Sequence, residues 1–214
     1  MPVVSELGVI AITTALMHAV LLGYVIIKRG FSRKLPRLLA AYLLMATLWD
    51  VGVLVDALPT MQHAFPLAYL YPLLPLTVLL WLYTVSFLPA TRNQWKIIGA
   101  GGGVLVVMAL VQFLPYRLPY LPIPFSGGRY LDKLTLVFWP VVGTAAFITG
   151  HTLWLTDNLQ ATLHSPRHQN RARLLNIALV TVAVGLVLSL IPVTAEVGLV
   201  IHWLGALEIG RAHV

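Results

Sequence analysis

Long apolar runs, separated by short polar stretches, dominate this chain. A helix needs about 20 apolar residues to cross the hydrocarbon core of a bilayer. Seven runs approach or reach that length, at 7–28, 37–58, 67–88, 96–115, 133–155, 173–193 and 195 to the end. A tight turn around IPVTAE separates the last two. The pattern predicts an all-α protein, a polytopic membrane bundle of seven transmembrane helices.

The connections between these runs differ strongly in charge. The first, third and fifth connections hold one acid, Asp157, and ten basic residues: Lys28, Arg29, Arg33, Lys34, Arg37, Arg92, Lys96, Arg167, Arg171 and Arg173. The opposite side holds three basic residues, Arg117, Arg129 and Lys133, and four acids, Glu6, Asp56, Asp132 and Glu196. Because cytoplasmic loops are rich in Lys and Arg, we expect the N-terminus outside and the seventh helix running inward.

Composition agrees with a membrane protein. The chain has 214 residues, of which 59% are hydrophobic and 10% charged, whereas soluble domains carry about a quarter charged residues. Basic membrane loops account for the net charge of +7, so we expect no nucleic-acid partner. The absence of cysteine excludes disulfides, thiolate metal sites and cysteine nucleophiles.

Polar residues within the predicted helices are the best functional candidates, because they are costly at membrane depth. Counting along the helices places Asp50 and His202 at a similar level in the outer part of the bundle, with His18 nearer the middle. The candidate ligand-binding residues are Asp50, His202, Gln112, Trp49, Trp139 and Trp203. They form either a buried polar group that fixes helix packing, or the floor of a ligand pocket or a proton-sensitive switch.

Catalytic and metal-binding motifs are missing. The last predicted helix has no Schiff-base lysine, and the chain has neither GxSxG nor HExxH. His164 and His168 have helical spacing, but Pro166 lies between them and no third ligand is close in sequence. We therefore expect this chain to have no catalytic residues, no cofactor and no metal site.

Three segments carry a family resemblance. RLLAAYLLMATLWDVGVLVDA, PLTVLLWLYTVSFLP and RHQNRARLLNIALVTVAVGLVLSLIPVTAEVGLVIHWLGAL resemble helices of the N-terminal seven-transmembrane sensor region of bacterial membrane histidine kinases and related signalling proteins. His168, Asn170 and Arg171 fit the basic turn of that family, whereas Gln169 stands where a basic residue is common.

This resemblance implies a sensory input domain in the bacterial inner membrane, not an enzyme. The signal would pass through the seventh helix to a cytoplasmic output module, such as a kinase or cyclase, beyond residue 207. The implied partners are the lipid bilayer, an unknown small ligand and that output module, and a homodimer is compatible with the layout. A small transporter or channel and an integral membrane enzyme acting on lipid stay open as alternatives.

The final residues have an unusual sequence. IGRAHV matches one reading frame of a widely used sequencing adapter, ATCGGAAGAGCACACGTC, and the preceding adapter bases AG fit a glutamate codon at Glu208. We therefore expect the native sensor domain to span 1–207 and residues 208–214 to be adapter translation.

Overall fold

The part of the chain that the structure describes is entirely helical. The computed structural model describes residues 6–29, 34–58, 68–86, 96, 99, 101–104, 106, 132–162, 166–191 and 193–212. Its helices are α1 (Glu6–Arg29), α2 (Lys34–Ala57), α4 (Leu70–Val85), α6 (Asp132–Thr162), α7 (Pro166–Ser189) and α8 (Ala195–Ala212). The predicted all-α class is confirmed, and the predicted run 96–115 lies mostly outside the described residues.

Among the residues that the structure describes, three helical segments are long and apolar enough to cross a membrane. They are Glu6–Lys28, Lys34–Ala57 and Ala172–Ser189, with mean hydropathies of 2.2, 2.0 and 2.0. The helix Leu70–Val85 is apolar but shorter. These lengths and compositions are compatible with a membrane protein.

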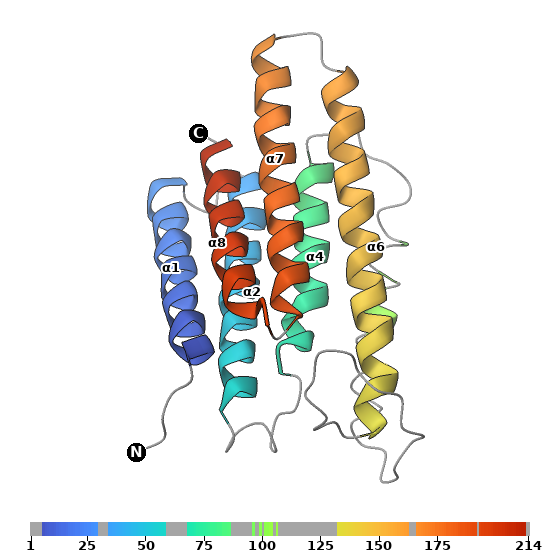
Figure 1. Ribbon diagram of the computed structural model, residues 1–214. Helices are drawn as coiled ribbons and strands as arrows, with labels where there is room; N and C mark the ends of the chain where they lie inside the picture. Colours follow the sequence, from blue (N-terminus) through green and yellow to red (C-terminus); the bar gives the residue numbers. More distant parts are fainter. Residues whose placement is uncertain are drawn as a thin grey trace.

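The helices form a closed ring, which Figure 1 shows from the side. Neighbouring helices pack in the order α1, α2, α4, α6, α7 and α8, and α8 returns to pack against α1. In addition, α2 contacts α8 across the ring. In the most apolar stretch of α2, 50% of the residues are buried, whereas in the most apolar stretch of α1 the buried share is 22%. The helix α2 therefore lies nearer the centre of the bundle.

Glycines allow α7 and α8 to pack closely as an antiparallel hairpin. A Cβ atom at Gly185 would lie 2.6 Å from the Cα of His202, and one at Gly205 would lie 2.7 Å from the backbone nitrogen of Val182. The connecting turn is held by Thr194, whose hydroxyl donates to the carbonyl of Leu188 over 2.8 Å. Because small residues let helix backbones approach, this hairpin fixes where α8 places its buried side chains.

Candidate functional site

Polar residues occupy the buried faces of three helices. On α1, Ala11, Thr14 and His18 are buried at spacings of three and four residues, which is one face of a helix. On α2 the buried face includes Tyr42, Ala46, Trp49 and Asp50, and on α8 it includes Leu199, His202 and Ala206. The helical period therefore directs these polar side chains into the bundle and not toward its surroundings.

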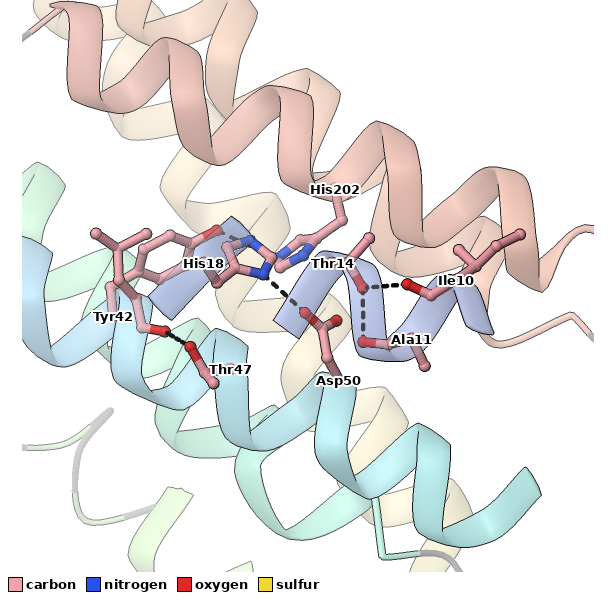
Figure 2. Close-up of polar contacts among 9 residues, drawn as sticks. Ile10, Ala11, Thr14, His18, Tyr42, Thr47, Asp50 and His202 are labelled. Carbon is pink, nitrogen blue, oxygen red and sulfur yellow. Dashed lines mark hydrogen bonds and ion pairs between the residues drawn. The ribbon is translucent and has the colours of Figure 1, made fainter. Parts of the chain in front are cut away.

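These faces meet in a polar cluster composed of His18, Tyr42, Trp49, Asp50 and His202. The Nδ1 atom of His18 lies 2.7 Å from the Oδ2 atom of Asp50. The Tyr42 hydroxyl lies 3.2 Å from Nε2 of His202. Figure 2 shows His18, Asp50, Tyr42 and His202 directed toward one another from α1, α2 and α8.

Aromatic ring contacts complete the polar cluster around His202. The centroid of its ring lies 5.2 Å from that of His18 and 5.1 Å from that of Trp49, and Trp49 meets it edge-on at 67°. The side chains of His18, Trp49, Asp50 and His202 are all 0% exposed. His202 thus links α8 to both α1 and α2 in a fully buried environment.

Several polar atoms of the polar cluster have no hydrogen-bond partner. They are Nε2 of His18, Nε1 of Trp49, Oδ1 of Asp50 and Nδ1 of His202. A buried polar atom without a partner costs about 1–3 kcal/mol. These four atoms belong to residues of one cluster, so the cluster holds several polar groups whose hydrogen bonds are not made within the protein.

The side chains of the polar cluster permit only a few kinds of chemistry. An imidazole and a carboxylate can exchange a proton, and both can coordinate a cation. The nearby Thr14 hydroxyl already donates to the backbone carbonyls of Ile10 and Ala11 in its own helix, at 3.1 and 3.2 Å. The polar cluster therefore offers imidazole and carboxyl groups that can bind a proton or a cation.

The structure brings together half of the residues predicted to form a site. Asp50, His202 and Trp49 lie in the polar cluster, and Trp203 follows on α8 as a half-buried side chain whose Nε1 is buried. Trp139 lies on α6 and is 43% exposed, and α6 packs against α4 and α7, not against α1, α2 or α8. Gln112 lies outside the described residues.

Tyr42 and His18 belong to the polar cluster but are not among the predicted site residues. For His18 the reason is a difference in level. Counting along straight helices placed it nearer the bilayer centre than Asp50, but the two side chains form a hydrogen bond. Figure 1 shows the Ala57 end of α2 extending past the Glu6 end of α1. Two residues at the same number of positions from these helix ends therefore lie at different depths in the bundle. The heptad-like spacing of Ala11, Thr14 and His18 was the available signal.

A second polar contact lies away from the polar cluster, between α4 and α6. Nε1 of Trp81 donates to Nδ1 of His151 over 3.0 Å, and Phe147 stacks on the same imidazole at 18°. His151 therefore takes part in the packing of α6 against α4, and it lies outside the polar cluster.

No family model matches the chain, and no curated protein and no solved structure shows significant similarity to it.

Proposed function

We propose that the chain is a membrane-embedded sensory input domain of a bacterial signalling protein of the histidine-kinase type. In this proposal the domain is a multi-pass protein of the inner membrane with seven spans and its N-terminus outside. A ligand or a change in the membrane alters the packing of α1 and α2. The last helix, α8, transmits this change to a cytoplasmic output module that follows it.

The observation that supports the proposal is the attachment of α8 to two other helices at one point. His202 on α8 contacts His18 on α1 through its ring and Tyr42 on α2 through a hydrogen bond. A relative movement of α1 and α2 would therefore change the environment of His202 directly. Such a junction can have two packings, and a stimulus that favours one of them shifts the population.

The exposed surface of α1 supports the membrane placement. Its outer face carries large apolar side chains, among them Leu16, Val20 and Ile27, which are 62%, 73% and 83% exposed. A contiguous apolar surface of this kind is unusual on a soluble monomer. In a bilayer the same side chains lie against lipid.

The helix directions support seven spans. In Figure 1, α1, α2 and α4 alternate in direction, as do α6, α7 and α8, but α4 and α6 run the same way. Seven spans require one further crossing between Val85 and Asp132, and the sequence predicts an apolar run there at 96–115. Residues 101–104 of that run are helical, and a Cβ at Gly101 would lie 3.4 Å from Val78 of α4.

Single-cysteine labelling tests the proposal, because the chain has no cysteine of its own. With an impermeant maleimide on intact spheroplasts, we expect Ser5→Cys and Val193→Cys to react, since Val193 is 94% exposed in the α7–α8 turn. Asn158→Cys, an exposed position near the end of α6, should react only after the membrane is opened. The reverse pattern would place the end of α8 outside, where it could not reach a cytoplasmic module.

The genomic reading frame provides a second test of the signalling function. The proposal requires the frame after α8 to continue into a cytoplasmic output module. A stop codon directly after α8 would contradict it. Substrate flux through proteoliposomes containing the purified chain would favour the transporter alternative instead.

A further inference from the structure

The polar cluster contains the donor set of a metal site. His18, Asp50 and His202 each offer one ligand atom, and these three atoms lie within 4.8 Å of one another. All three residues are 0% exposed. They come from three different helices, so the bundle itself assembles the set.

We propose that His18, Asp50 and His202 bind a divalent first-row transition-metal ion, with Zn²⁺ as the reference case. Imidazole and carboxylate ligands without sulfur suit Zn²⁺ and its neighbours in the first transition series. Zinc lies about 2.0–2.2 Å from such ligands, so two ligands of one ion are at most roughly 4.4 Å apart. The ligand atoms lie within 4.8 Å of one another, so side-chain movements of about 1 Å would bring them to the spacing of about 3.4 Å that a tetrahedral zinc site needs.

The hydrogen-bonding state of His202 fits this role. Its Nε2 atom faces the Tyr42 hydroxyl, whereas its Nδ1 atom is buried without a partner. When Nε2 carries the proton and donates it to the phenol oxygen, Nδ1 presents a lone pair to an ion. Metal-binding histidines are commonly oriented in this way through their second nitrogen.

Asp50 and His18 supply the remaining ligands. Oδ1 of Asp50 has no partner, and its Oδ2 atom is 2.7 Å from Nδ1 of His18. An ion would take the place of the hydrogen between them, and that proton would move to Nε2 of the same His18 ring. The two ligand atoms would then separate to about 3.4 Å, the distance between neighbouring ligands in a tetrahedral zinc site.

Electrostatics gives a physical reason for an ion at this place. The side chains of Asp50 and His18 are both fully buried, with Nδ1 of His18 2.7 Å from Oδ2 of Asp50. A buried carboxylate without a compensating charge is costly, and a bound cation offsets that cost. The inference concerns binding by the polar cluster and holds whether or not α8 carries a signal.

Metal binding by the full chain tests the inference directly. The protein is purified in lipid nanodiscs, with any histidine tag removed, and titrated with Co²⁺, whose visible absorption reports tetrahedral coordination. We expect one Co²⁺ per chain, displaced by Zn²⁺. Asp50→Asn and His202→Gln should weaken Co²⁺ binding by roughly 100-fold, and Tyr42→Phe, which removes only the orienting hydroxyl, by about 10-fold.

His151→Gln is the matched control, because His151 is a partly buried histidine outside the polar cluster. It should bind Co²⁺ like the unaltered chain. Circular dichroism shows whether each variant is folded. As a measurement that needs no variant, Zn²⁺ should raise the unfolding temperature of the unaltered chain, because an ion that binds only the folded state stabilises it. A folded chain with no Co²⁺ absorption and no Zn²⁺-dependent stabilisation would overturn the inference, as would binding that His151→Gln alone abolishes.

Discussion

Replacing Asp50 with alanine should lower the free energy of unfolding by about 3 kcal/mol, the upper end of the range for leaving a buried hydrogen-bonding group without its partner. The substitution leaves Nδ1 of the fully buried His18 without its partner at 2.7 Å. Hydrogen bonds between membrane helices contribute on average only about 0.6 kcal/mol. We expect more here because both side chains are completely buried and the carboxylate can carry a charge.

A double-mutant cycle separates the His18–Asp50 interaction from the loss of packing. Asp50→Ala, His18→Ala and the double variant are unfolded at equilibrium in mixed micelles, and the cycle should give a coupling energy of about 1–3 kcal/mol. Asp157→Ala, an exposed acid on α6, is the control and should change stability by less than about 0.5 kcal/mol. A coupling energy near zero would mean that the two residues do not support each other in the folded protein.

Replacing Gly185 with alanine should lower the free energy of unfolding by about 3 kcal/mol, toward the upper end of the cost of overpacking a core. The new Cβ would overlap the backbone nitrogen of His202 and lie 2.6 Å from its Cα. Because the obstacle is backbone, no side-chain rotation relieves it, and α8 must move away from α7. The movement also displaces His202 from the polar cluster.

Gly23→Ala is the matched control for this prediction. A Cβ at Gly23 in α1 would have nothing within 4 Å, so the same chemical change meets open space. Alanine is the better helix former, and the control should be neutral or stabilising by up to about 1 kcal/mol. Equal unfolding midpoints for Gly185→Ala and Gly23→Ala in mixed micelles would exclude the close approach of α7 and α8.

The sequence predicted the helices well because their length and apolar character are local properties. Six of the seven predicted runs contain a described helix, and the turn between α7 and α8 falls at Ile191 and Thr194, where the sequence placed it. Which face of each helix is buried was less evident. On α1, apolar side chains lie on the exposed face as well as on the buried one, so hydropathy alone does not distinguish the side that carries His18.

The candidate site was predictable only in part for the same reason. Asp50 and His202 stand out because polar side chains within apolar helices are costly. Trp139 was included by depth alone, and depth does not reveal that α6 is separated from α8 by α7 in the ring. The meeting of His18, Asp50 and His202 depends on helix order around the ring, which no spacing along the chain encodes.

The polar cluster joins α1, α2 and α8, and the contact between His18 and Asp50 is the shortest contact within it. Solid-state NMR on the full chain in lipid, with ¹⁵N-labelled histidine and ¹³Cγ-labelled aspartate, measures that contact through dipolar recoupling. We expect a strong histidine–aspartate coupling that disappears in both Asp50→Asn and His18→Phe and persists in His151→Gln. A coupling that survives Asp50→Asn, or no coupling in the unaltered chain, would contradict this contact.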